Sequence, residues 1–455
     1  MRYSVRAIGA GIALIAILCL FTGFGLSTLF PGPGIPHKTV EIWARSNALK
    51  GYYFMTPLNT RKAGTFPKRS TLMILDEKGS ILYYKQLALG SDFKLQPGKN
   101  TSYFGSGAFY VMNSSFAVID SVKCIGDAKT DPHDFLILPN GNYLLIGKKA
   151  ITEDFSRKQI FLRHGVRGSK RATAKYDVIQ EISPAGRLVF EWDSRQIYNI
   201  NDADTYYLTD TAVVDVTHFN SVDADTSGNL LVSVRFFDEV IKIRKSDGAV
   251  IWRMGGKRNQ VKCVNDTIPF RGQHDARFSG PGRFTVFDNG FGYDSLRHSP
   301  RGLEYAVDDN TKTARLLWKH QCEFPLVCSS AGNMQRLENG STLIGYGKQE
   351  NEGTKLAVEI VDSYGHDQTQ AWYTDSMFTY RTFFYNHLPF HLTQPKITKK
   401  KSATLWRLST ASKYRFYRWS NGQTTDVIIA DKPGRYFVDV SNDGQSFFRS
   451  ETQRL

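Results

Sequence analysis

A recurring hairpin pattern runs along most of the chain and constrains its fold more than any other feature. Each hairpin has two short stretches rich in Val, Ile, Phe and Tyr that flank a tight turn at a glycine, as in paired antiparallel strands. The turns fall at Gly79, Gly141, Gly228, Gly282 and Gly340, within segments 70–87, 133–147, 217–235, 274–290 and 332–347. Regular recurrence of one hairpin indicates a repeat architecture.

A second hairpin follows most of these segments, at 177–194, 239–256, 302–320 and 357–373. Four antiparallel strands in a unit of roughly 55 residues are typical of a β-propeller blade. A tryptophan near the end of most fourth strands is expected to pack between blades: Trp192, Trp252, Trp318 and Trp372. A basic insert at 157–175 explains the longer interval between Gly141 and Gly228. Five units are clear and a sixth is expected from residues 373–400, closed by N-terminal strands, so we predict an all-β, six-bladed β-propeller.

The N-terminus predicts a membrane anchor. Arg2 and Arg6 precede residues 7–30, which carry no charge and are long enough to span a bilayer. No convincing cleavage site follows, which favours an uncleaved signal-anchor over a cleaved signal peptide. Either interpretation places the rest of the chain on the periplasmic or extracytoplasmic side. The predicted domains are an anchor (1–30), the propeller (31–400) and a C-terminal β-sandwich-like module (401–455), whose strands at 413–444 follow a different period.

The formal net charge of +15 has two interpretations: a basic surface without specific meaning, or attraction for anionic lipids or substrates. Because Lys and Arg are scattered and no nucleic-acid motif is present, we expect no nucleic-acid partner. The five cysteines (Cys19, Cys124, Cys263, Cys322 and Cys328) include no CxxC pair. The last four could form two disulfides or remain free.

Histidine occupies one repeat position three times. His133, His218 and His274 each open the first strand of a unit, whereas the fifth unit has Gly332-Asn333 there. First strands of propeller blades line the central channel, so the three imidazoles are expected around one end of it.

The hairpin at 217–235 adds two polar residues to this group. Asn220 follows His218 by two positions, so both should share one face of the strand. Antiparallel pairing should return Arg235 to the side of His218, and should likewise bring Asp288 and Asn289 close to His274.

Three interpretations of this cluster compete: solvated rim residues, a three-histidine metal site, and a site that handles an anion. Imidazoles suit zinc, but a cationic Arg235 beside the metal would be unfavourable. Imidazole and guanidinium groups suit a sulfuryl or phosphoryl group, whose charge is spread over its oxygens. A neutral imidazole could also act as nucleophile and divide the transfer into two steps.

An ordered set of motifs resembles the bacterial arylsulfotransferases that use no nucleotide sulfate donor. The set is DPHDFLILPNGN, HFNSVD, GNLLVSVR, IWRMGGK, QHDARF, FDNG, RGLEY and GNMQRLENGSTLIGYG, and the resemblance covers roughly residues 70–385. It implies an exported six-bladed propeller that transfers a sulfuryl group from an aryl sulfate to a phenolic acceptor. The implied route is a ping-pong reaction through a sulfohistidine, with no cofactor.

Carried over residue by residue, the resemblance makes His274 the nucleophile. His218 and Asn220 match an HxN pair, and His133 and Arg235 match the remaining anion-binding positions. The chain departs from the family prototypes, which have an N-terminal β-sandwich, and the acceptor is therefore open to other hydroxyl compounds. The alternative function is a membrane-anchored propeller that binds an anionic glycan or a protein partner without catalysis.

Overall fold

The computed structural model describes residues 36, 39–45, 48–59, 70–163, 165–204, 211–292, 299–350, 355–374 and 377–455. The predicted anchor at residues 7–30 lies outside these residues and stays a prediction. In the part of the chain that is described, no helix is long and apolar enough to cross a membrane.

The described residues contain six units of four antiparallel strands each. We call them sheets 1 to 6 and number them by where their second, third and fourth strands occur in the chain. Sheet 1 contains β27 (Met377–Tyr385), β2 (Tyr52–Asn59), β3 (Ser70–Asp76) and β4 (Ile81–Leu87). Sheet 2 contains β5 (Gly90–Gln96), β6 (Asn100–Gly105), β7 (Ala108–Met112) and β8 (Val118–Val122). Sheet 3 contains β9 (Lys129–Ile137), β10 (Tyr143–Glu153), β11 (Ala172–Ile182) and β12 (Leu188–Asp193).

The other three units follow the same plan. Sheet 4 contains β14 (Phe219–Ala224), β15 (Leu230–Val234), β16 (Glu239–Ile243) and β17 (Val250–Gly255). Sheet 5 contains β19 (His274–Gly280), β20 (Arg283–Asp288), β21 (Arg301–Asp308) and β22 (Thr313–Gln321). Sheet 6 contains β23 (Cys328–Arg336), β24 (Thr342–Gln349), β25 (Leu356–Val361) and β26 (Asp367–Tyr373), with β1 (Val40–Ala44) paired outside β26.

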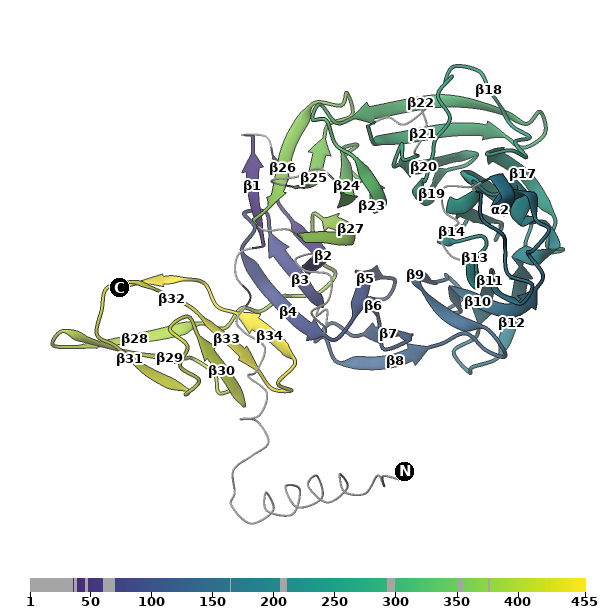
Figure 1. Ribbon diagram of the computed structural model, residues 1–455. Helices are drawn as coiled ribbons and strands as arrows, with labels where there is room; N and C mark the ends of the chain where they lie inside the picture. The colour runs from purple at the N-terminus through teal and green to yellow at the C-terminus, as the bar shows by residue number, and fades with distance from the viewer. Residues whose placement is uncertain are drawn as a thin grey trace, which may run out of the picture. The chain divides into compact units, whose positions relative to one another are not determined.

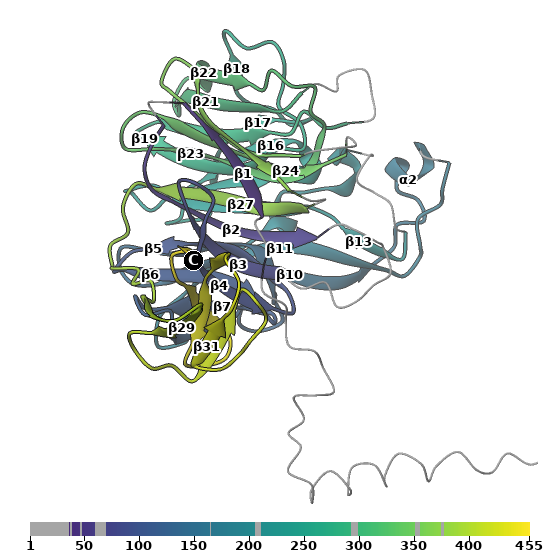
Figure 2. The same ribbon diagram turned by 90° about the vertical axis from the view of Figure 1, so that its left-hand side faces the viewer.

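The sheets form a propeller-like ring in which β27, β5, β9, β14, β19 and β23 lie nearest the centre (Figure 1). This all-β arrangement agrees with the predicted fold class. Short additional strands pair with two outer strands: β13 (Val213–Asp215) with β11, and β18 (Lys262–Cys263) with β22. Figure 2 shows β13 and the short helix α2 (Gln159–Arg163) on the same side of the ring.

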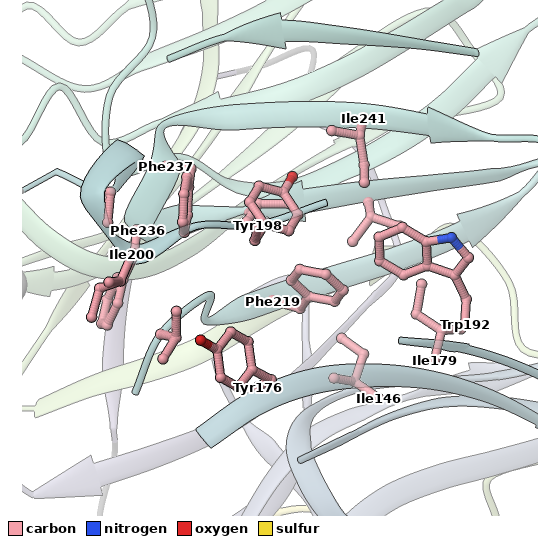
Figure 3. Close-up of a cluster of buried hydrophobic side chains, with 14 of the residues drawn as sticks. Ile146, Tyr176, Ile179, Trp192, Tyr198, Ile200, Phe219, Phe236, Phe237 and Ile241 are labelled. Atoms are coloured by element: carbon pink, nitrogen blue, oxygen red, sulfur yellow. The ribbon is translucent and has the colours of Figure 1, made fainter. Parts of the chain in front are cut away.

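Apolar side chains pack between neighbouring sheets. Between sheets 3 and 4, Trp192 and Tyr198 both lie against Phe219, with ring centroids 6.2 and 6.3 Å away (Figure 3). The predicted role between units is confirmed for three of the four tryptophans by hydrogen bonds to the next sheet. The indole N–H of Trp192 donates to Gly248 O (2.9 Å), that of Trp252 donates to Asp309 Oδ1 (2.7 Å), and that of Trp318 donates to Ser363 O (3.3 Å).

The predicted division into units is wrong at its start. The hairpin at Gly79 is the outer half of sheet 1, whose two inner strands are β27 and β2. The prediction that residues 373–400 and N-terminal strands complete a unit together is confirmed by the pairing of β27 with β2. Residues 90–122 form sheet 2, which the glycine spacing did not reveal. Its inner strand buries Asp92 and Lys94, and these charges hide the apolar alternation of a strand.

The C-terminal strands form two sheets around a shared core. One sheet contains β28 (Ile397–Ser402), β29 (Leu405–Thr410) and β31 (Val427–Ala430). The other contains β30 (Phe416–Trp419), β33 (Val438–Ser441) and β34 (Ser446–Arg449), and continues sheet 1 because β34 pairs with β4. A short ladder joins β32 (Arg435–Tyr436) and β35 (Gln453–Arg454). Leu408, Trp419 and Val440 are among the buried residues of the shared core.

Candidate functional site

Bulges near the start of several innermost strands form the backbone of the site. The pairing register shifts between Phe219 and Ser221 in β14, and between His274 and Arg277 in β19. Positive φ angles occur at these places and their equivalents: His218 (56°), Asp275 (58°), Ala331 (62°) and Asp92 (52°). Such conformations are uncommon for residues other than glycine, and bulges re-aim side chains close to active sites. Bulges and positive φ angles therefore recur near the start of the innermost strands, which makes this end of the strands the candidate site.

Two of the three predicted histidines are in direct contact. The ring centroids of His133 and His218 lie 4.8 Å apart, with the rings inclined by 72°. Tyr380 of β27 connects them with the third, because its centroid lies 5.4 Å from that of His133 and 6.5 Å from that of His274. The hydroxyl of Tyr380 donates to Asn220 O at 3.0 Å. The structure thus brings His133, His218 and His274 into one cluster, with Tyr380 as a member that sequence reasoning missed.

His133 and His218 each have a carboxylate partner at Nδ1. The partner of His133 is Asp131 Oδ1, and that of His218 is Asp215 Oδ2 at 2.7 Å. An Nδ1–H that donates to a carboxylate fixes the ring orientation and favours the imidazolium form. Burial still outweighs this partner for His218 and, with Lys148 and His133 nearby, lowers the pKa of His218 to about 3.

Lys148 of β10 holds the carboxylates behind these histidines. Its Nζ lies 2.7 Å from both oxygens of Asp215, 3.6 Å from Asp131 Oδ2 and 3.7 Å from Asp177 Oδ1. Burial raises the pKa of Asp131, but His133 and Lys148 together bring it down to about 2. Burial and the charges of Asp215 and Asp131 outweigh Lys148 at Asp177 and raise its pKa to about 7. One lysine therefore links both histidine–aspartate pairs.

His274 differs from the other two histidines because its Nδ1 faces neutral acceptors. Nδ1 lies 2.9 Å from Gly272 O and 2.8 Å from Asn289 Oδ1. The amide of Asn289 donates to Ala331 O at 3.0 Å, which turns its oxygen towards the imidazole. On the other side of the ring, Nε2 accepts the backbone N–H of Ala331 at 3.1 Å. These contacts assign the proton to Nδ1 and the lone pair to Nε2, as a nucleophilic histidine requires.

The electrostatic surroundings keep His274 neutral. Only 2% of its surface is exposed, and burial is the main reason why its pKa lies well below the usual value. The positive charge of Arg235 is the second cause, followed in the same direction by His218 and His133. The predicted approach of Asn289 to His274 is confirmed by its hydrogen bond.

The expected position of Arg235 is confirmed by the backbone. Arg235 N donates to His218 O at 3.1 Å, where β15 runs into the turn at 235–237. The guanidinium donates to Ser329 O at 2.7 Å and so reaches across to the strand that follows His274 and its sheet. Phe236 stacks on His218 with centroids 4.5 Å apart. Arg235 therefore links the backbone of His218 to β23, and its charge also acts on His274.

Asn220 contacts the backbone beside His274. Its side-chain amide donates to Gln273 O at 2.7 Å, and the residue is fully buried. The bulge next to Asn220 interrupts the two-residue alternation on which its expected side was based. That Asn220 shares a face of the strand with His218 therefore stays a prediction.

A buried charge cluster lies next to the histidines, centred on Arg381 of β27. Its guanidinium lies 2.8 Å from Asp92, 3.2 Å from Asp134 and 2.9 Å from Asp275. It also donates to His133 O at 3.0 Å and to Asn220 O at 2.7 Å. Sequence reasoning missed Arg381, and the available signal was a lone arginine within the aromatic strand 377–385.

The three-histidine metal interpretation is not supported by the geometry. Within the described residues, His133, His218 and His274 are not a group whose ligand atoms converge on one ion. Of the two outcomes left open for the downstream cysteines, the structure shows free thiols at Cys124, Cys263, Cys322 and Cys328.

Fold and site together define a class: an all-β, propeller-like protein whose innermost strands place imidazoles and a guanidinium together, as an anion-handling site requires. The family model described as Arylsulfotransferase (ASST) matches residues 98–352, which include all three histidines and Arg235. The chain belongs to the arylsulfotransferase family. This membership supports a sulfotransferase activity in general.

No curated protein matches the chain. A protein of unknown function from Bacteroides caccae is 12% identical with a TM-score of 0.45, covering 72% of this chain and 98% of that one. A catalytically inactive virginiamycin B lyase from Staphylococcus aureus, solved with quinupristin, is 6% identical with a TM-score of 0.35, covering 82% and 95%. TM-scores below 0.5 do not establish a shared fold.

Proposed function

We propose that this protein transfers a sulfuryl group from an aryl sulfate ester to a phenolic or other hydroxyl acceptor, through a sulfohistidine at His274. The reaction is ping-pong and uses no nucleotide sulfate donor or other cofactor. The observation that carries the proposal is the fixed tautomer of His274, whose Nδ1–H faces Gly272 O and Asn289 Oδ1. A buried neutral imidazole with its lone pair on Nε2 is an activated nucleophile for an electrophilic sulfur.

In the first half-reaction, Nε2 of His274 forms a bond to sulfur while the bond from sulfur to the aryl oxygen breaks. The bonding electron pair leaves on the phenolate oxygen. Arg235 balances the charge on the sulfuryl oxygens, because it already acts electrostatically on His274. Removal of one such donor typically lowers a rate by about 10²–10³-fold.

His133 and His218 supply the proton in this scheme. Each is backed by an aspartate at Nδ1, so Nε2 is the nitrogen that takes up or releases a proton. An anionic donor raises the pKa of a neighbouring imidazole and favours the imidazolium. One of the two then protonates the departing phenolate and, in the second half-reaction, accepts the proton of the acceptor hydroxyl as its oxygen attacks sulfur.

In this scheme, the backbone N–H of Ala331 leaves Nε2 of His274 when the substrate reacts. Its N–H donates to Nε2 of His274 at 3.1 Å and occupies the lone pair that attacks sulfur. As the bond to sulfur forms, this hydrogen bond breaks and the N–H becomes a donor for a sulfuryl oxygen. The αL conformation of Ala331 directs that N–H towards the imidazole.

We also propose the setting of the reaction. The six sheets form a six-bladed β-propeller, and residues 7–30 anchor it to the membrane with the active site on the periplasmic or extracytoplasmic side. Support comes from the sheet order and from the uncharged segment behind Arg2 and Arg6. Recovery of the full-length chain in the membrane fraction, with its N-terminus intact, is the expected result. A mature N-terminus near residues 28–36 would replace the anchor with a cleaved signal.

The experiment that tests the activity uses 4-nitrophenyl sulfate as donor and phenol as acceptor. Purified protein should release 4-nitrophenolate and form phenyl sulfate in equal amounts. The His274→Ala variant should form neither product. The matched control is His366→Gln, because the side chain of His366 is 75% exposed and no step of the proposed reaction uses it. Stoichiometric retention of the aryl sulfate without product would instead indicate a binding protein.

A further inference from the structure

A second cluster of ligating side chains joins sheets 5 and 6. The His320 ring, the Glu359 carboxylate and the Asp367 carboxylate each offer one ligand atom, and these atoms all lie within 4.8 Å of one another. His320 belongs to β22, Glu359 to β25 and Asp367 to β26. We propose that these three residues bind a divalent transition-metal ion, with zinc as its representative, and that the ion fastens the two sheets together.

The ligand set fits such an ion. Zinc accepts imidazole nitrogen and carboxylate oxygen at about 2.0–2.2 Å, and sites with three protein ligands leave one position for water. Two ligand atoms at these bond lengths lie about 3–4 Å apart, and His320 Nε2 and Glu359 Oε2 are separated by 3.2 Å. An imidazole in the set favours a first-row transition metal over magnesium or calcium, which prefer oxygen ligands alone.

The charges of the cluster also favour a cation. Glu359 is 1% exposed, and its carboxylate lies beside that of Asp367. Two carboxylates that repel each other in a partly buried place are stabilised by a divalent ion.

Further hydrogen bonds orient the ligands, as outer partners do at metal sites. The hydroxyl of Tyr346 donates to Glu359 Oε2 at 2.5 Å. The amide of Gln370 donates to Glu359 Oε1 at 3.2 Å and to Asp367 Oδ2 at 2.9 Å. The indole of Trp318 stacks on His320, with centroids 6.1 Å apart and an angle of 19° between the rings.

A surface pocket borders one of the three proposed ligands, Asp367. It has a volume of about 300 Å³ and is lined by Asp367, Gln370, Trp43 and Arg45, among others. Asp367 thus belongs both to the ligand group and to the wall of a solvent-accessible pocket. The competing explanation is that His320, Glu359 and Asp367 form a hydrogen-bonded cluster without an ion.

Metal analysis of the intact protein tests the proposal. After dialysis against EDTA and then zinc-free buffer, the wild type should take up one Zn²⁺ in calorimetric titration and show a higher Tm with Zn²⁺ present. Co²⁺ in its place should give visible d–d absorption. Replacement of an outer partner, as in Gln370→Ala, should lower zinc affinity by about 10–100-fold. The ligand variants His320→Gln and Asp367→Asn, of which the second keeps the shape of the side chain, should each lower it at least as much.

The control variant is His366→Gln, which removes an exposed imidazole from the turn between β25 and β26 and should leave zinc binding unchanged. His274→Ala should also retain the zinc site, which separates this cluster from the proposed catalytic histidines. Absence of stoichiometric zinc binding in the wild type overturns the proposal. Unchanged affinity in folded Asp367→Asn overturns it equally, because the ion would then lie elsewhere.

Discussion

His133 and His218 lie with their ring centroids 4.8 Å apart, and each presents its Nδ1 to an aspartate that Lys148 also contacts or approaches. The two residues belong to different sheets, so their contact depends on the packing of sheets 3 and 4. His274 has only neutral acceptors at Nδ1. This contrast separates one histidine held by neutral acceptors from two held by carboxylates, and it underlies the division of roles in the proposed reaction.

Replacement of Lys148 by methionine should destabilise the protein strongly. The variant leaves Asp131, Asp177 and Asp215 close together without their shared cation. Loss of one partner of a buried ion pair typically costs about 3–5 kcal/mol, which urea unfolding would measure. The pKa of His218 should rise, since Lys148 lowers it, and histidine NMR titration would report that change.

The neighbouring Lys149→Met variant is the matched control. Lys149 pairs with Glu191 and with Asp127, of which Asp127 is 76% exposed. Such pairs contribute about 0–1 kcal/mol. Equal destabilisation by the two variants would show that Lys148 has no special role as the common partner of the aspartates.

The pH dependence of stability should contain a contribution from His218. Its folded pKa is about 3 against a usual value of 6.5, so the unfolded chain binds more protons between these values. Stability therefore falls as pH decreases through this window, by about 1.4 kcal/mol per pH unit for one such group. Asp177, whose pKa is raised to about 7, changes stability in the opposite direction over much of the same range. The informative quantity is thus the difference between wild type and His218→Gln.

Urea unfolding at pH 6 and pH 4 would measure that difference. The loss of unfolding free energy on acidification should be smaller in His218→Gln than in the wild type. The same loss in both proteins would mean that His218 is not held neutral by its buried position.

Asn289→Ala should impair catalysis more than binding. Without the amide oxygen at 2.8 Å, the imidazole of His274 loses one of the two acceptors that fix its tautomer and orientation. A misplacement of about 1 Å at a reacting group lowers rates by about 10²-fold, so kcat should fall by this order with KM nearly unchanged. Asn339→Ala, in the turn before β24, is the control with unchanged kcat. Wild-type kcat in Asn289→Ala would argue against tautomer control.

Arg381→Met should destabilise the fold at its centre. The guanidinium is fully buried and contacts Asp92, Asp134 and Asp275 from three other strands. Its loss should cost about 3–5 kcal/mol in unfolding free energy. Arg195→Met, at an ion pair whose arginine is 40% exposed, should cost less than about 1 kcal/mol. Near-equal unfolding free energies in the two variants would contradict this account of the centre.

Much of the fold was predictable because turn glycines and apolar strands follow a regular period. Hairpins with strong turns, such as the one at Gly228, were identified correctly together with the return of Arg235 to His218. Sheet 2 was missed because its inner strand buries charged residues, which a local pattern of apolar residues does not reveal. Asp92 and Lys94 pair with each other, but their further partners Asp134 and Arg381 come from distant strands, which no local pattern reveals.

The candidate site was predictable in its histidines but not in their surroundings. Repeat alignment identified His133, His218 and His274, since equivalent positions meet at the centre of a ring. Lys148 and Tyr380 were missed because each lies in an ordinary-looking strand and acquires its role only through tertiary contacts. The bulge beside Asn220 was also missed, because no sequence motif indicates the shift in strand register between Phe219 and Ser221.

Intact-protein mass spectrometry after brief exposure to an aryl sulfate, without an acceptor, tests the central claim most directly. The wild type should gain the mass of one sulfuryl group, located by peptide mapping at His274 and removed when phenol is added. The His274→Ala variant should gain none. A wild type that turns over the donor without an adduct, or an adduct that persists in His274→Ala, would contradict the sulfohistidine mechanism.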